Sequence, residues 1–213
     1  MGQQADLIAK YNLYRKKNKG LNNKLIQSCL DRESILQAAE LLGMAENGKI
    51  MLEDVQESDV IMDFALNDCL KDGKTAVERY AYNVGATDEI EQEILEGLQS
   101  SYTSLFKETA VSRENRTVDL DDVLGNRGRI QIIDNGLSMS YSWNTLLFLR
   151  IVPLKSFSMT SGIFFAFPEE TKSRMMRAYE NFYQRIPADN EDIRRFAAFF
   201  RTSRIFGKQG MFI

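Results

Sequence analysis

Residues 146–153 read Leu-Leu-Phe-Leu-Arg-Ile-Val-Pro. An apolar run of this length fits a strand that is covered on both faces of a sheet better than it fits a helix. Pro153 ends the strand, because proline has no N–H group to donate to a neighbouring strand. The stretch therefore predicts a central strand of a buried β-sheet.

Other strand-like segments surround this one. They are short, rich in β-branched or alternating apolar residues, and separated by polar turns; they cover residues 118–123, 129–133, 137–140 and 162–167. The turn Asp134-Asn135-Gly136 contains Asn-Gly, the strongest short signal for a β-hairpin. Five short strands so close together predict a small, bent antiparallel sheet or barrel.

The flanking regions carry apolar residues at helical spacing. We expect Asp31 to cap one helix, Gly43 to terminate it, and Thr87 to cap another that reaches about Thr109. The expected helices cover residues 3–17, 21–30, 31–42, 58–73, 75–83, 87–109 and 168–186, and a last helix, capped by Asp189 or Asn190, holds Ile193, Phe196, Ala197 and Phe200. The chain is thus predicted to be α+β, with a mainly helical region over 1–112, a β-rich module over 113–167 and C-terminal helices over 168–213.

Charge is distributed unevenly along the chain. Residues 1–111 carry a net charge of −7, residues 112–171 carry −1 and residues 172–213 carry +5. The whole chain is at −3, so it lacks the general basic character of most nucleic-acid binders. Because the two helical regions have opposite charge, we expect them to pack against each other, so that the three regions form one compact body.

The sequence predicts a cytoplasmic protein. Its first residues have no apolar segment of the kind found in a signal peptide, and no apolar run approaches the length of a membrane span. Cys29 and Cys69 each lie on an apolar helical stripe, which indicates reduced, buried thiols.

Several segments together resemble a known family. The segments are Ile-Met-Asp-Phe-Ala-Leu-Asn-Asp at 61–68, Thr-Ala-Val-Glu-Arg-Tyr at 75–80, Ser-Ser-Tyr-Thr-Ser-Leu-Phe-Lys at 100–107, Val-Asp-Leu-Asp-Asp-Val-Leu-Gly at 118–125, Asp-Asn-Gly-Leu-Ser at 134–138 and Leu-Leu-Phe-Leu-Arg-Ile-Val-Pro-Leu at 146–154. Their order resembles an uncharacterised prokaryotic family with a helical region followed by a small β-barrel-like module. The resemblance covers roughly residues 58–168. It implies that some relatives occur beside a SEC-C zinc motif, whose Cys-x-Cys…Cys pattern is missing here, and it implies no activity and no catalytic residues.

The amino-acid inventory excludes several common mechanisms. The chain has no histidine, so the usual Ser-His-Asp and Cys-His nucleophiles and the H-E-x-x-H zinc site are ruled out. Two cysteines forty residues apart do not form a cysteine-rich zinc site, and no standard phosphate-binding loop is present. We therefore expect no catalytic residues, no metal and no cofactor.

Two groups of acidic residues have alternative interpretations. Asp59 with Asp63, and Asp68 with Asp72, are spaced i and i+4 and could face a metal, but we favour a solvated acidic helix face. The segment 119–122 begins like a calcium loop, yet the following residues do not continue the pattern, which favours a strand edge.

Residues 159–162, Met-Thr-Ser-Gly, are a candidate ligand-binding segment. Thr160, Ser161 and Gly162 could expose backbone N–H groups to an anion. The alternative is an ordinary connection in which Gly162 supplies a positive φ angle or a bulge.

The C-terminal region is both basic and aromatic. Its cationic residues are Arg185, Arg194, Arg195, Arg201, Arg204 and Lys208, and Arg127 and Arg129 could extend them into one patch. Arginine beside phenylalanine is typical of nucleic-acid and protein interfaces. We favour pairing of these arginines with the acidic N-terminal helices, or between protomers, over nucleic-acid contact.

The function hypotheses follow from these patterns. The first is a non-enzymatic binding or protein-interaction module that binds a protein partner or self-associates. The alternative is a nucleic-acid-associated protein that uses the basic C-terminal patch. A metal-dependent enzyme using carboxylates has the weakest support.

Overall fold

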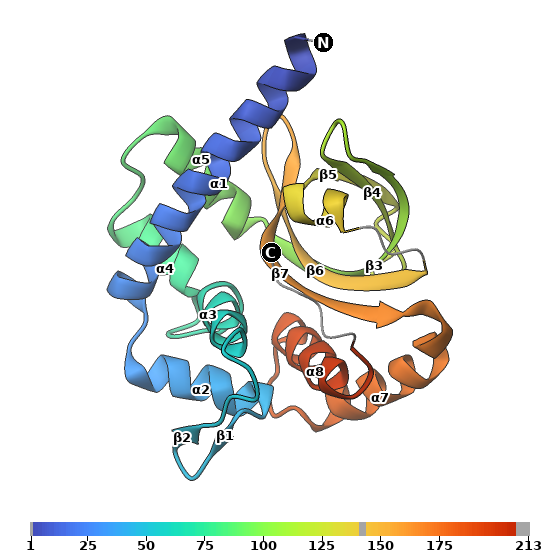
Figure 1. Cartoon of the computed structure of the whole chain (residues 1–213). Helices are drawn as coiled ribbons and strands as arrows, with labels where there is room; N and C mark the ends of the chain where they lie inside the picture. The colour runs from blue at the N-terminus through green and yellow to red at the C-terminus, as the bar shows by residue number, and fades with distance from the viewer. Residues whose placement is uncertain (1, 141–143, 208–213) are drawn as a thin grey trace.

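The computed structural model describes residues 2–140 and 144–207, which form an α+β fold, as the sequence predicts (Figure 1). The helices are α1 (Gly2–Cys29), α2 (Arg32–Leu42), α3 (Glu57–Asn67), α4 (Ala76–Asn83), α5 (Glu89–Gln99), α6 (Asn135–Met139), the 3₁₀ helix η1 (Glu169–Thr171), α7 (Lys172–Arg185) and α8 (Glu191–Phe206). The strands are β1 (Ala45–Glu46), β2 (Lys49–Ile50), β3 (Tyr102–Ser112), β4 (Thr117–Asp122), β5 (Arg129–Ile133), β6 (Thr145–Pro153) and β7 (Ser158–Pro168). None of the helices within the described ranges has both the length and the apolar character needed to cross a bilayer.

Five strands form one antiparallel sheet in the order β5-β4-β3-β6-β7, and β1 pairs with β2 in a separate hairpin. The large sheet curls around α6 (Figure 1). Its two edge strands, β5 and β7, come close to each other, but the strand pairing does not join them. The architecture is therefore a strongly bent sheet, and the expected barrel does not close.

Strand β6 is the central strand that its composition predicts. Every residue from Thr145 to Val152 is buried. Leu147, Leu149 and Ile151 face the inside of the curl, while Leu146 and Phe148 pack against helices on the other face. Both faces are covered, which explains why the sequence here is apolar without alternation.

The helices cover the outer face of the sheet in two groups. Helices α2, α3, α7 and α8 pack on β6 and β7 in one hydrophobic cluster, where the rings of Phe148 and Phe199 stack with centroids 4.2 Å apart. Helices α1, α4 and α5 form a second cluster around Val152 and Met159. The two clusters meet near the middle of β6.

The N-terminal helix differs from the expectation, because it continues through Gly20 instead of ending there. Tyr11, Tyr14, Leu21 and Leu25 form one continuous buried stripe along α1. Their burial outweighs the helix penalty of a single glycine, which is about 0.5–1 kcal/mol relative to alanine. The neighbouring expectation is confirmed, since Asp31 caps α2 and Gly43 ends it at φ 76°.

The helix expected over residues 87–109 ends at Gln99, and its N-cap is Asp88 instead of Thr87. The following residues form β3. The apolar residues Tyr102, Leu105 and Phe106 suit helical spacing, but in β3 Leu105 faces the outer helices and Phe106 faces the inside of the curl. The helical prediction was wrong because a short apolar run fits both the repeat of a helix and the alternation of a strand.

The expected hairpin at Asn135-Gly136 and the expected strand over 137–140 are also wrong. The Asp134 carboxylate accepts a hydrogen bond from the Leu137 N–H at 2.9 Å, which makes it the N-cap of α6. Leu137 then packs inside the curled sheet. The helix cap and this burial together replace the hairpin.

Candidate functional site

The segment Thr160-Ser161-Gly162 lies in a bulge of β7. Thr160 pairs with Ile151 and Phe164 pairs with Leu149, so that residues 161–163 all lie opposite Arg150. Gly162 has a φ of 106°, a conformation that favours glycine. The interpretation of Gly162 as a positive-φ residue in a bulge is confirmed.

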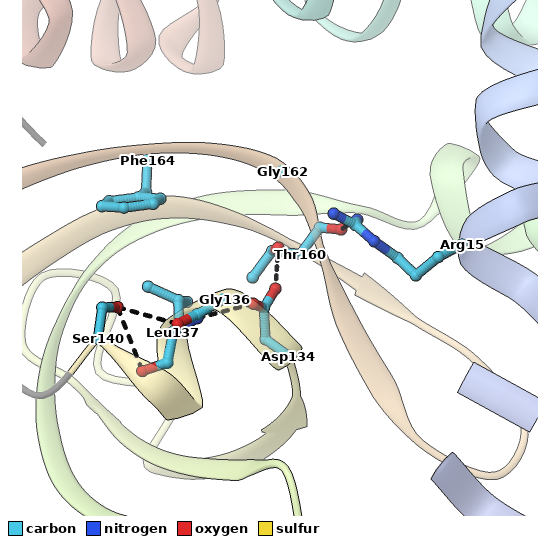
Figure 2. A pocket seen from close by; sticks show the side chains of 8 residues that line it. All are labelled: Arg15, Asp134, Gly136, Leu137, Ser140, Thr160, Gly162 and Phe164. Carbon is cyan, nitrogen blue, oxygen red and sulfur yellow. Dashed lines mark hydrogen bonds between the residues drawn. The ribbon is translucent and has the colours of Figure 1, made fainter. Parts of the chain in front are cut away.

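A small cleft borders this bulge, between α1, α6 and β7 (Figure 2). The Arg15 Nη1 donates to the Thr160 carbonyl oxygen at 2.8 Å, and the Thr160 hydroxyl donates to the Asp134 Oδ2, also at 2.8 Å. The cleft volume of about 20 Å³ has room for about one water molecule. These residues tie α1, β7 and the start of α6 together, and the cleft is too small for an organic ligand.

Arg127 and Arg129 make local contacts at the other end of the sheet. The Arg127 guanidinium lies 4.1 Å from the centroid of the Tyr102 ring, and the Arg129 Nε contacts the Asp121 carboxylate at 3.1 Å. Among the carboxylates of residues 119–122, Asp122 instead accepts backbone N–H groups, including that of Gly125 at 2.7 Å. Within the described part of the chain, no group of three or more candidate ligand side chains is placed to hold a metal ion.

The C-terminal arginines do not form one open patch. The Arg194 guanidinium lies over the Tyr183 ring at 5.0 Å, and Arg195 pairs with Asp192 one turn earlier. Arg201 and Arg204 reach the N-terminal region. The Arg201 Nη2 donates to the Leu41 carbonyl oxygen at 2.9 Å, and Arg204 donates two hydrogen bonds of 2.9 Å to the Glu57 carboxylate. The expected pairing with acidic residues of the N-terminal region is thus seen for Arg204, whereas Arg201 reaches the same region through a backbone carbonyl oxygen. Lys208 lies outside the described residues.

The most unusual charged group is Arg150, in the middle of β6. Its side chain is 3% exposed, its Nε lies 3.3 Å from an oxygen of Asp63, and its Nη2 donates to Asp68. Both carboxylates come from the end of α3, where Asp68 is the C-cap. The expected solvated acidic face is wrong for Asp63 and Asp68, because both are buried on this guanidinium.

The burial of this group changes its titration. Burial raises the pKa of Asp68 to about 7; the Arg150 guanidinium opposes that shift and the Asp63 carboxylate adds to it. For Arg150, burial lowers the pKa, but the two carboxylates together raise it above its ordinary value. Arg150 is therefore charged, and the raised pKa of Asp68 allows this carboxyl group to take up a proton near neutral pH.

A polar cavity of about 150 Å³ lies beside Arg150. It is bounded by the C-terminal ends of α3 and α5, the N-terminal ends of α4 and α8, and the start of β3. Its polar and charged lining residues include Asn67, Asp68, Glu78, Thr103, Arg150 and Asp192.

Two buried polar atoms of the wall have no hydrogen-bond partner among the described residues, the hydroxyl oxygen of Thr103 and the side-chain oxygen of Asn67. Thr103 is 4% exposed and lies directly opposite Arg150 in the pairing of β3 with β6. A buried polar atom without a partner costs about 1–3 kcal/mol. Two residues that line the cavity thus carry hydrogen-bonding capacity that the described protein atoms do not use.

This site was not predicted from the sequence, although a signal was present. Arg150 is the one charged residue in the apolar stretch 146–152. A strand buried on both faces can hold an arginine only if carboxylates neutralise it. That requirement predicts buried carboxylates against β6, although the sequence alone does not say which acids are used.

Neither the curated proteins nor the solved structures contain a match to this chain. A family model described as a family of unknown function, DUF7986, matches residues 5–213. Nearly the whole chain is covered, and the protein therefore belongs to the DUF7986 family of unknown function.

Proposed function

We propose that this protein is a non-enzymatic binding module and that its ligand site is the polar cavity beside Arg150. The observation that carries the proposal is the pair of buried, unpartnered atoms in the wall, the Thr103 hydroxyl and the Asn67 carbonyl oxygen. A ligand that bonds to both atoms would remove their cost. A pocket with convergent polar groups and a perturbed carboxyl group is also the usual setting for ligand binding.

The size of the cavity limits the ligand. A cavity of about 150 Å³ accommodates a molecule of about six non-hydrogen atoms. A nucleotide or a peptide is too large to enter it. The candidate ligands are therefore small polar metabolites.

Thermal unfolding in the presence of small polar amines, diols and carboxylates tests this proposal. A ligand at a hundredfold excess over its dissociation constant stabilises the native state by about 2.7 kcal/mol, which raises Tm. Thr103→Val removes the hydroxyl without changing the shape, so it should abolish most of the Tm increase. Thr109→Val is the matched control, because Thr109 is an exposed residue of the same strand whose hydroxyl donates to the Asp119 carbonyl oxygen. The proposal fails if no compound raises Tm, or if Thr103→Val responds as the wild type does.

A protein-interaction function has a separate observation in its favour. The β1–β2 hairpin and the segment after it expose four apolar side chains, Ile50, Met51, Leu52 and Val55, of which Val55 is 83% exposed. Exposed apolar groups of this kind favour a protein partner or self-association. Analytical ultracentrifugation of the wild type and of Val55→Glu tests this candidate, which predicts a larger species only for the wild type.

The nucleic-acid alternative has weaker support, because Arg201 and Arg204 are occupied by contacts with α2 and α3. Phosphate contacts are strongest at low salt, so we expect no oligonucleotide binding even there. We further propose that the family is prokaryotic, that some relatives occur beside SEC-C motifs, and that the protein is cytoplasmic. The regions 1–112, 113–167 and 168–213 are proposed to act as one compact body.

A further inference from the structure

We propose that the ligand of the cavity beside Arg150 is a compact organic cation with an ammonium group, such as a short aliphatic diamine. This inference rests on the proposed function, because it specifies the ligand of the same site. Three kinds of observation support it: the charge of the lining, the direction of the surrounding helices and the type of unused hydrogen-bonding atoms.

The lining carries more negative than positive charge. Asp68, Glu78 and Asp192 contribute carboxylates, and Arg150 is the one cationic residue among the described residues that line the cavity. Arg150 is already paired with Asp63 and Asp68, so its charge is more than compensated. An anion would meet repulsion here, whereas a cation would be attracted.

The helix ends around the cavity favour the same sign. The C-terminal ends of α3 and α5 have partial negative charge, and neither helix has a basic residue in its last turn. The N-terminal ends of α4 and α8 have partial positive charge, but Glu78 and Asp192 lie in their first turns and compensate it. The uncompensated helix ends are thus the two that attract a cation.

The polar atoms without a partner favour a ligand that donates hydrogen bonds. The Asn67 side-chain nitrogen donates to the Asp63 carbonyl oxygen at 2.9 Å, which fixes the orientation of the amide and leaves its oxygen as an acceptor. The Thr103 hydroxyl can also accept. Glu78 uses Oε2 to accept from the Thr75 N–H in the capping box, and Asp192 uses Oδ1 to accept from Arg195. An ammonium group donates and does not accept, so it matches these atoms.

Isothermal titration calorimetry on the full chain at low salt tests the inference with three probes of similar size: 1,4-diaminobutane, 1,4-butanediol and butyrate. We expect heat of binding for the diamine only. Binding should also tighten between about pH 6 and pH 8, because Asp68, which faces Asp63, Arg150 and Asp192, loses its proton over that range.

A charge-removing variant makes the test specific. Glu78→Gln keeps a side chain that can complete the capping box, so α4 should fold normally. Loss of one charge-assisted contact should weaken diamine binding by about tenfold. Glu180→Gln is the matched control, because Glu180 lies exposed on α7 and does not line the cavity, and it should bind like the wild type.

The outcomes separate this inference from the proposed function. If the diol or butyrate binds as tightly as the diamine, and Thr103→Val removes that binding, the cavity is a ligand site but the cation inference is wrong. If the diamine binds equally to Glu78→Gln and to the wild type, the cation inference is also wrong. If none of the three probes binds, the cation inference is wrong. The thermal-unfolding screen of amines, diols and carboxylates then decides whether the cavity is a ligand site.

Discussion

Replacing Arg150 by methionine should destabilise the protein strongly. Methionine is shorter than arginine and has no charge, so in β6 it replaces the aliphatic part of the side chain and leaves out the guanidinium. It leaves the carboxylates of Asp63 and Asp68, whose side chains are 9% and 3% exposed, without their cationic partner. Removing one member of a buried ion pair costs about 3–5 kcal/mol, and we expect Arg150→Met to fall in this range at pH 7.

Urea unfolding followed by circular dichroism measures this change directly. A second variant separates charge from packing. In Arg150→Met/Asp63→Asn/Asp68→Asn the unpaired charges are gone, so most of the lost stability should return. Arg129→Met is the matched control, because the Arg129–Asp121 pair is exposed and surface pairs contribute about 0–1 kcal/mol.

Two results would refute this reasoning. The first is a loss of less than about 1 kcal/mol in Arg150→Met, which would mean that the two carboxylates reach water or protonate without cost. The second is a triple variant that is no more stable than Arg150→Met. In that case the guanidinium contributes through its packing. Neutralisation of the two carboxylates is then not what stabilises the contact between the two helical clusters.

Three further predictions concern stability. The folded-state pKa of Asp68 is raised, so the free energy of unfolding should fall as pH rises from about 4 to about 7, and Asp68→Asn should flatten this dependence in urea titrations at several pH values. Gly97→Ala should cost about 1–3 kcal/mol, because its Cβ would lie 2.7 Å from the Pro153 carbonyl oxygen, whereas Gly20→Ala, in open space within α1, should stabilise by about 0.5–1 kcal/mol. Asp134→Ala should lower the free energy of unfolding by about 2–3 kcal/mol, because the N-cap of α6 and the bond from the Thr160 hydroxyl are both lost; equal Tm values for wild type and variant would contradict it.

Local sequence patterns were enough to predict the central strand of the sheet and the ends of one helix. The run 146–152 gave β6 because a strand covered on both faces must be apolar throughout. Asp31 and Gly43 gave the ends of α2 because their side-chain and backbone preferences act within one turn of the chain. Each of these features depends on residues that are close together in the sequence.

The predictions that failed depended on distant contacts. Asn135-Gly136 favours a hairpin locally, but Leu137 gains burial inside the curled sheet only when α6 forms. Gly20 weakens a helix locally, but Leu21 and Leu25 extend the buried stripe of α1. The partners of Arg150 lie more than eighty residues earlier in the chain, so no local pattern could identify them.

The packing of α8 has a consequence for the biosynthesis of the protein. Phe196 and Phe199 of this last helix cover Phe148 in β6, and Arg204 binds Glu57. At about 5–20 residues per second, the ribosome needs about 2–8 s to add the 38 residues from the end of β7 to the end of α8. Until then the apolar outer face of the sheet has no cover over Phe148. A nascent chain of this protein should thus recruit chaperones late in translation, and a truncation before α8 should aggregate although the whole sheet has been synthesised.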